Sequence, residues 1–132
     1  MATDIKTNFK TNIEVNSTEQ VLRTVYAAFN SRDVDTVLGF MHRDVDWPNG
    51  MEGGRVHGHN GVREYWTRQW KMLDPKVEPV GFAPDDAGRT VVEVKQVVHD
   101  MQGTLLMDRM VQHIYTMQDG LIRSMEIRES EQ

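Results

Sequence analysis

Residues 44–66 read DVDWPNGMEGGRVHGHNGVREYW. The stretch begins as a short strand that ends at Trp47, continues as a loop rich in proline and glycine, and then enters a helix that carries Tyr65 and Trp66. This order predicts that Trp47, Asn49 and the two helix rings lie around one opening. We interpret the opening as the mouth of a ligand pocket.

The composition is that of one ordinary globular domain. The chain has 132 residues, of which 39% are hydrophobic and 27% are charged. A chain of this length buries most of its surface in a single core. We expect residues 17–132 to form this domain, and residues 1–16, which are rich in Thr, Asn and Lys, to form a flexible leader. The absence of cysteine excludes disulfides and thiolate metal sites.

Charge and hydropathy exclude several classes of partner. The formal net charge is −5 and no segment carries a cluster of Lys or Arg, so we expect no nucleic-acid surface. No apolar run approaches the roughly 20 residues that a membrane-spanning helix needs, and we expect no membrane partner. The N-terminal segment lacks the apolar core of a signal peptide. A cytoplasmic location is therefore the expectation.

Helical periodicity dominates the first half of the chain. Apolar residues recur at helical spacing over residues 18–30, and Asp33 is placed to cap a second, short helix. A third helix is predicted over residues 60–73. It would end at Asp74-Pro75, because the residue before a proline is driven out of helical geometry.

The second half of the chain has the features of long hairpins. Runs of β-branched residues between turn residues predict that the strand at Asp44–Trp47 is followed by four more, at Val77–Pro84, Thr90–Met101, Thr104–Met117 and Leu121–Arg128. Helices followed by hairpins predict an α+β fold, in which three N-terminal helices pack on the concave face of a curved antiparallel sheet. Such a cone has a hollow interior.

With these elements in order, the chain resembles the nuclear-transport-factor-2-like superfamily, in the branch of the ketosteroid isomerases and SnoaL-like polyketide cyclases. The resemblance covers about residues 18–128 and rests on residues 29–33 (FNSRD), 44–47 (DVDW), 57–58 (HG), 61–66 (GVREYW) and 119–122 (DGLI). It implies the cone-shaped fold, a ligand pocket without a cofactor, and dimers formed through the sheet. The superfamily includes enzymes and non-catalytic domains, so the fold alone does not choose between them.

The resemblance also implies roles for particular residues. The aspartate that moves the proton in ketosteroid isomerases corresponds to Asn49, and an amide can hold a substrate oxygen but is no general base. The tyrosine that helps to hold the enolate corresponds to Val25, and the neighbouring Tyr26 is expected to point elsewhere. The second oxyanion-holding carboxyl corresponds to His113, and a histidine donates a hydrogen bond or exchanges a proton near neutral pH.

Strand alternation extends the candidate site from His113. If His113 faces inward, the same face of its strand carries Arg109, Val111 and Tyr115. We expect the preceding strand to bring His99 to that side, together with Val97, Lys95 and Glu93. In the alternative register the core faces are the opposite ones, with Val92, Val94, Gln96 and Val98 on one strand and Leu106, Asp108, Met110, Gln112 and Ile114 on the next. A slip of one residue exchanges the two assignments.

The predicted walls of the pocket are aromatic and apolar side chains, namely Trp47, Tyr65, Trp66, Val111, Tyr115 and Met125. Plain core packing remains the alternative for the aromatic residues, because an aromatic stripe on a helix is commonly core. His57 and His59 have the spacing of a chelating pair, but no third or fourth ligand accompanies them, so we expect no metal.

We therefore hypothesise a small-molecule enzyme of the isomerase, cyclase or lyase type that acts without a cofactor on an apolar carbonyl compound. His113 would donate or accept the proton, Asn49 would orient the substrate, and Arg109 and His99 would assist. The alternative is a non-catalytic module of the same fold that only binds a ligand, which the amide at position 49 favours. A homodimer is expected in either case.

Overall fold

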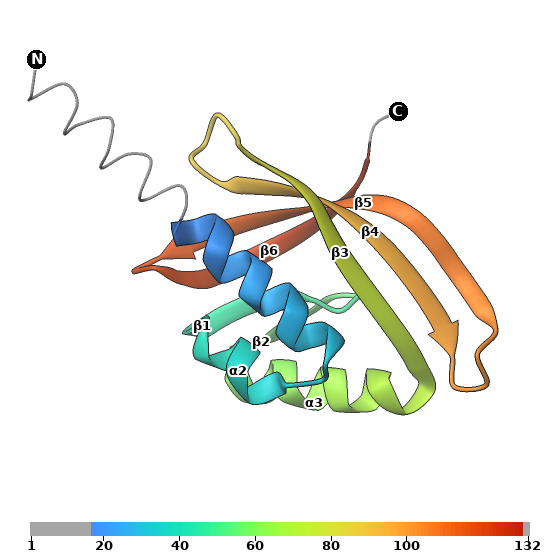
Figure 1. Ribbon diagram of the computed structural model, residues 1–132. Helices are drawn as coiled ribbons and strands as arrows, with labels where there is room; N and C mark the ends of the chain where they lie inside the picture. Colours follow the sequence, from blue (N-terminus) through green and yellow to red (C-terminus); the bar gives the residue numbers. More distant parts are fainter. Residues whose placement is uncertain (1–16, 131–132) are drawn as a thin grey trace, which may run out of the picture.

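The computed structural model describes residues 17–130, in which helices pack against one curved sheet (Figure 1). A helix over residues 17–30 comes first. It is followed by α2 (Val34–Gly39), β1 (Met41–Pro48), β2 (Arg55–His57), α3 (Gly58–Met72), β3 (Leu73–Pro84), β4 (Thr90–Asp100), β5 (Leu105–Gln118) and β6 (Leu121–Glu129). The predicted leader, residues 1–16, lies outside the described residues.

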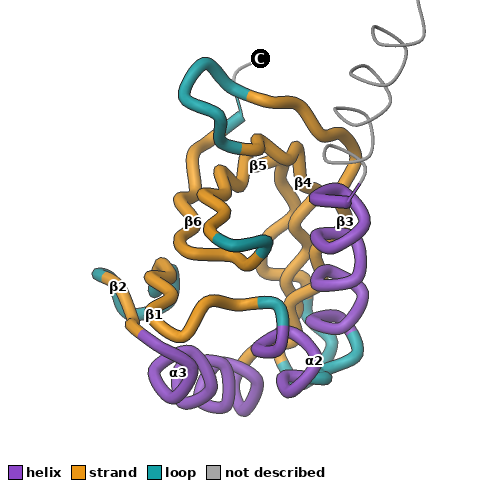
Figure 2. The backbone as a smooth tube through the Cα atoms, turned by 90° about the vertical axis from the view of Figure 1, so that its left-hand side faces the viewer, coloured by secondary structure: helices purple, strands orange, loops and turns teal. Residues whose placement is uncertain are grey.

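The six strands form one sheet in the order β2-β1-β6-β5-β4-β3. Strands β3 to β6 are a meander of antiparallel neighbours, and β2 pairs antiparallel with β1. The pairing of β1 with β6 is parallel, so the sheet is mixed rather than wholly antiparallel. Figure 2 shows the sheet curving, with the helix of residues 17–30 beside β3 and β4 and with α3 beside β1. The predicted α+β class with a curved sheet is confirmed.

No helix within residues 17–130 combines the length and the apolar character that crossing a membrane requires.

Local sequence chemistry explains the turns. Asp119 and Gly120, with φ of 56° and 77°, make the tight β5–β6 connection, as the Asp-Gly pair predicted. Between β4 and β5, the carboxylate of Asp100 accepts hydrogen bonds from the backbone N–H groups of Gln102 and Thr104, each at 2.9 Å. These turns fix the ends of the long strands, and each ladder has a register shift close to its turn.

Several element boundaries differ from the prediction. Helix α3 ends at Met72, and β3 begins directly at Leu73, so Pro75 lies inside a strand. A proline is tolerated there because β3 is the edge strand of the sheet, where a missing N–H donor breaks no ladder. Strand β1 begins at Met41 rather than at Asp44.

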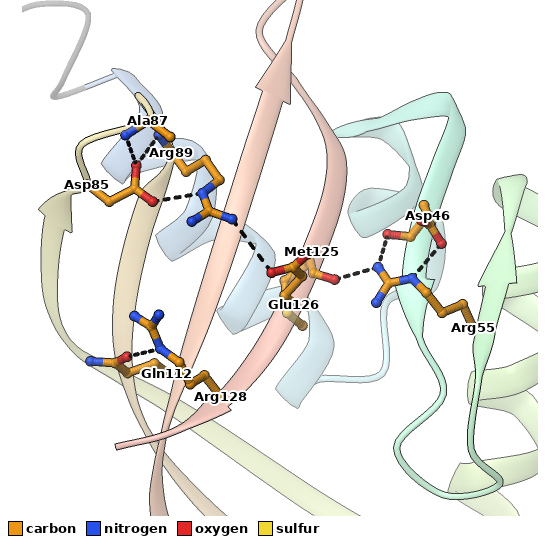
Figure 3. Close-up of polar contacts among 9 residues, drawn as sticks. All are labelled: Asp46, Arg55, Asp85, Ala87, Arg89, Gln112, Met125, Glu126 and Arg128. Atoms are coloured by element: carbon orange, nitrogen blue, oxygen red, sulfur yellow. Dashed lines mark hydrogen bonds and ion pairs between the residues drawn. The ribbon is translucent and has the colours of Figure 1, made fainter. Parts of the chain in front are cut away.

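Arg55 joins β2, β1 and β6, the three strands around the parallel pair of the sheet (Figure 3). Its Nε donates to Asp46 Oδ1 at 2.7 Å, and its Nη2 donates to the carbonyl oxygens of Asp46 at 3.0 Å and Met125 at 2.6 Å. The guanidinium of Arg55, on β2, therefore links β1 to β6. These two strands pair directly at few positions, because the register between them shifts from Met41 to Asp46. Figure 3 also shows Arg89 bridging Asp85 to Glu126 on β6.

The register of β4 against β5 corrects the predicted face of β4. Val92 lies opposite His113, Val94 opposite Val111, and Gln96 opposite Arg109. Directly opposed residues share a face. The side that carries His113 therefore carries the buried valines of β4, and Glu93, Lys95 and Val97 lie on the other side. The register shifts at His99, and strand alternation from Val98, which faces the same side as His113, places His99 on the other side too. The prediction for β5 was right and that for β4 was wrong, because burying Val92 and Val94, each 0% exposed, outweighs any preference of the ionisable residues.

Candidate functional site

A cavity of about 190 Å³ lies between the helix of residues 17–30, α3 and the concave side of the sheet. Its apolar walls include Val25, Phe29, Trp47, Met51, Trp66, Val77, Val98, Met125 and Ile127. Its polar lining consists of the side chains of Tyr26, Tyr65, Gln69, Gln96, Arg109, His113 and Tyr115. Among the described residues, no Asp or Glu lines it.

His113 lies on β5 and faces this cavity, with only 6% of its surface exposed. Its Nδ1 is 2.8 Å from the hydroxyl oxygen of Tyr26, and the two rings stack with an angle of 17° between their planes. The hydroxyl of Tyr115 donates to the Tyr26 oxygen, also at 2.8 Å. The three side chains therefore form one buried hydrogen-bonded chain.

The hydrogen-bond partners of Tyr26 indicate where the protons lie in this buried hydrogen-bonded chain. With the Tyr115 hydroxyl as the donor to the Tyr26 oxygen, the hydrogen of Tyr26 is directed to Nδ1 of His113, which is then the acceptor nitrogen of a neutral ring. The opposite tautomer would move the unpaired donor from the ring of His113, which faces the cavity, to the O–H of Tyr115, which is 1% exposed. An unpaired buried donor costs about 1–3 kcal/mol. The ring proton of His113 is therefore on Nε2, which forms no hydrogen bond within the described residues.

Burial controls the ionisation of all three groups. It lowers the pKa of His113 to about 4, because the charged ring would lose its hydration. Burial also raises the pKa of Tyr115 and, together with the adjacent Tyr115, the pKa of Tyr26. At neutral pH the chain is therefore uncharged, and His113 is a neutral N–H donor rather than a cation.

Tyr26 is the residue that the sequence reasoning missed. It was expected to point away from the pocket, but it lines the cavity, is 3% exposed and contacts His113. The signal was present in the spacing of Leu22, Tyr26 and Phe29, which lie on one face of a helix. Leu22 is fully buried, so that face is the one directed at the core.

The aromatic residues predicted for the walls lie together. Trp47 meets Trp66 edge-on with ring centroids 5.6 Å apart, and lies 6.3 Å from Tyr115. Tyr65 is oriented by its hydroxyl, which accepts from the Met51 backbone N–H at 3.3 Å and from the side-chain amide of Gln69 at 3.1 Å. These residues are both cavity wall and core.

Three predicted site residues lie elsewhere. The side-chain amide of Asn49 donates to Glu52 Oε1 at 2.9 Å and accepts from the Glu52 backbone N–H at 2.8 Å, so it organises the loop and does not line the cavity. Val111 is buried opposite Val94 in the core, away from the cavity lining. His99 does not line the cavity, and strand alternation from Val98, which does, places it on the far side of the sheet.

Arg109 lies at the exposed rim of the cavity, on the same face of β5 as His113. Its Nε donates to the side-chain oxygen of Gln96 at 3.0 Å, across the β4–β5 ladder. The bond holds the guanidinium on the cavity side of the sheet.

The two histidines before and in α3 have separate partners. His57 Nδ1 is 3.4 Å from Asp46 Oδ1, whereas His59 Nε2 is 2.9 Å from the carbonyl oxygen of Met41. Within residues 17–130, no group of three or more His, Cys, Asp or Glu side chains is arranged to hold a metal ion.

Sequence comparison matches residues 22–125 of this chain to the SnoaL-like domain family. The chain is a SnoaL-like domain. No curated protein matches it significantly. Among solved structures, it is similar to TerC co-crystallised with polyporic acid, with 30% identity, a TM-score of 0.74, and coverage of 86% of this chain and 92% of that one.

Two further structures resemble this SnoaL-like domain. One is an NTF2-like protein of unknown function from Burkholderia pseudomallei, with 26% identity, a TM-score of 0.74, and coverage of 86% of this chain and 91% of that one. The other is a proposed polyketide cyclase from Xanthomonas campestris, with 18% identity, a TM-score of 0.74, and coverage of 87% and 91%. At that identity the second likeness concerns the fold alone.

Proposed function

We propose that this SnoaL-like domain is a cofactor-independent enzyme, of the isomerase, cyclase or lyase type, that polarises the carbonyl group of a small molecule with an apolar framework. The observation that carries the proposal is the chain from Tyr115 through Tyr26 to His113, which leaves the Nε2–H of His113 as a donor toward an apolar cavity. A donor that is held in place before the substrate binds stabilises charge as it develops on a carbonyl oxygen.

The ionisation of the chain favours polarisation over full proton transfer. If His113 gave up its Nε2 proton, negative charge would form in a buried site whose tyrosines have raised pKa values. A hydrogen bond from the neutral ring has no such cost, and its strength increases as water is excluded. His113 therefore acts as an electrophile that stabilises an enol or enolate.

The proton that leaves carbon needs another acceptor. No carboxylate lines the described cavity, and Asn49 is engaged in its own loop. Water or a basic group of the substrate itself then takes this proton. This requirement restricts the reaction to substrates whose α C–H is made more acidic by conjugation or by a second carbonyl group.

The similarity to TerC co-crystallised with polyporic acid supports a small organic ligand for this fold. The missing carboxylate favours a second candidate function, a domain that binds such a ligand without converting it. The two functions differ in whether a bound ketone exchanges its α-hydrogens.

The test is the rate at which 2-tetralone exchanges its α-hydrogens in D₂O near neutral pD, followed by proton NMR. We expect the wild-type domain to accelerate exchange, and His113→Asn to reduce that acceleration at least tenfold. His99→Asn is the matched control, because His99 lies on the opposite side of the sheet and its replacement leaves the rate unchanged. Binding of 2-tetralone without any acceleration would favour the non-catalytic function.

We also propose that two copies of the chain associate. Large apolar side chains are exposed at the end of the β4–β5 hairpin, namely Met101, Leu105, Leu106 and Met110. Their exposed fractions lie between 37% and 55%, and exposed apolar patches of this kind commonly mark contact surfaces. A second copy of the chain is the occupant that we propose for them.

A further inference from the structure

The cavity has an unbalanced charge. Among the described residues that line the cavity, Arg109 is the one Arg or Lys, and there is no Asp or Glu. The chain as a whole has the opposite bias, with 20 acidic and 15 basic residues. The bias of the cavity is therefore a local feature that composition does not explain.

The guanidinium of Arg109 is positioned but not neutralised. Its Nε is bonded to the neutral amide of Gln96, and within residues 17–130 no carboxylate lies within 4.0 Å of it. The neighbouring Asp108 points to the other face of β5, where its carboxylate is 4.0 Å from Lys95 Nζ. The terminal N–H groups of Arg109 remain available, and their planar arrangement matches the two oxygens of an anionic group such as a carboxylate.

We infer that the natural ligand is an aromatic acid, whose anionic oxygen group pairs with Arg109 at the rim while its carbonyl oxygen accepts from His113 inside. The anionic group is a carboxylate or an ionised phenol or enol. The carbonyl half of this assignment rests on the proposed function, and the anionic half rests on Arg109 alone.

The dimensions of the site fit such a ligand. Arg109 and His113 lie on one face of β5, four residues apart, so their Cα atoms are separated by roughly 13 Å. The arginine side chain shortens the distance that the ligand must span to about that of a two-ring compound. The same cavity is lined by the rings of Trp47 and Trp66, which offer flat apolar surface, and Trp47 lies 6.3 Å from Tyr115. An ion pair beside these walls is less screened than one in open water.

The test measures binding by calorimetry with matched two-ring ketones. 4-Benzoylbenzoate carries the carboxylate, and 4-benzoylbenzamide is its neutral counterpart. We expect the wild-type domain to bind the acid at least tenfold more tightly than the amide. Arg109→Met should remove this preference by weakening the acid alone, and Arg109→Lys should retain part of it.

Lys95→Met is the matched control, because it removes the same charge from the neighbouring strand on the side away from the cavity. It should preserve the preference for the acid. A measurement that needs no variant is the salt dependence, since the affinity for the acid should fall as NaCl is added while that for the amide stays constant.

A second acid separates the two sources of negative charge. The affinity for 4-hydroxybenzophenone should rise with pH as its phenol ionises, and should do so in wild type but not in Arg109→Met. If the affinity for the carboxylate, for the phenolate or for both depends on Arg109, the inference is supported, and the result identifies which anionic group the site accepts. Equal binding of acid and amide by the wild type, or equal loss of both in Arg109→Met, overturns it.

The outcomes also distinguish this inference from the proposed function. Acid binding that depends on Arg109, without any effect of His113→Asn on exchange at carbon, would reject the proposed function and leave the anion site standing. Exchange that depends on His113, with no preference for acids, would reject the anion site alone.

Discussion

The burial of His113 predicts a specific loss of stability in mild acid. In the unfolded chain this imidazole takes up a proton below its ordinary value of 6.5, whereas burial holds its pKa at about 4 in the folded protein. Between these values the unfolded state binds more protons, so the free energy of unfolding falls as the pH falls. At about 1.4 kcal/mol per pH unit, the whole window is worth about 3 kcal/mol.

About 2 kcal/mol of this loss should appear between pH 7 and pH 5. We would measure it by urea unfolding followed by tryptophan fluorescence, since Trp47 and Trp66 are buried. The comparison is with His113→Asn, whose side chain offers an oxygen to Tyr26 but does not titrate. The stability advantage of the wild type over this variant should shrink by about 2 kcal/mol between the two pH values.

The comparison removes the contributions of other groups. Hydrogen bonds lower the carboxyl pKa values of Asp33, Glu52 and Glu93. The ionised forms of these carboxyls stabilise the fold above the ordinary carboxyl pKa, and this contribution is lost as the pH falls through their lowered pKa values. That pH range lies below most of the range from 6.5 to about 4 in which His113 acts. The carboxyl contribution is lost equally in wild type and variant. If the two proteins lose stability in parallel from pH 7 to pH 5, the imidazole is not held neutral by burial and the reasoning fails.

Three further changes test other parts of the structure. Tyr26→Phe leaves buried polar groups on both sides without a partner, and should lower the free energy of unfolding by about 1–3 kcal/mol in urea titrations; an unaffected midpoint would contradict the hydrogen-bonded chain. Asn49→Ala should loosen its loop, costing about 1–2 kcal/mol, yet change ketone affinity by less than about twofold, because the amide does not line the cavity; a tenfold loss of affinity would restore it as a ligand contact. Leu106→Lys places a charge in the exposed apolar patch and should convert a dimer to a monomer in sedimentation velocity; a wild-type protein that is already monomeric at micromolar concentration would exclude the dimer.

The fold was predictable because its signals are local. The Asp119-Gly120 turn, the cap at Asp33 and the change from helical to strand periodicity near position 76 each depend on a few neighbouring residues. The parallel pairing of β1 with β6 was not predictable in this way, because it joins residues that are far apart in the sequence. Local patterns specify elements, and the pairing between distant elements is determined by the shared core.

The site was predictable only in part for the same reason. The inward face of His113 and the walls at Trp47 and Trp66 followed from strand alternation and helical spacing. His99 was misplaced because the faces of two strands are related by register, which the burial of valines decided. The engagement of Asn49 with Glu52, three residues on, is a local contact that the loop sequence could have indicated.

The central claim is that His113 is a buried neutral imidazole whose proton is on Nε2. Nitrogen-15 NMR of the histidine rings measures this directly, with His113→Asn assigning the signal. We expect one ring that keeps the chemical shifts of the Nε2–H tautomer from pH 8 down to pH 5, and titrates only near pH 4. A ring that carries its proton on Nδ1 at neutral pH, or that is fully charged at pH 5.5, would contradict the account.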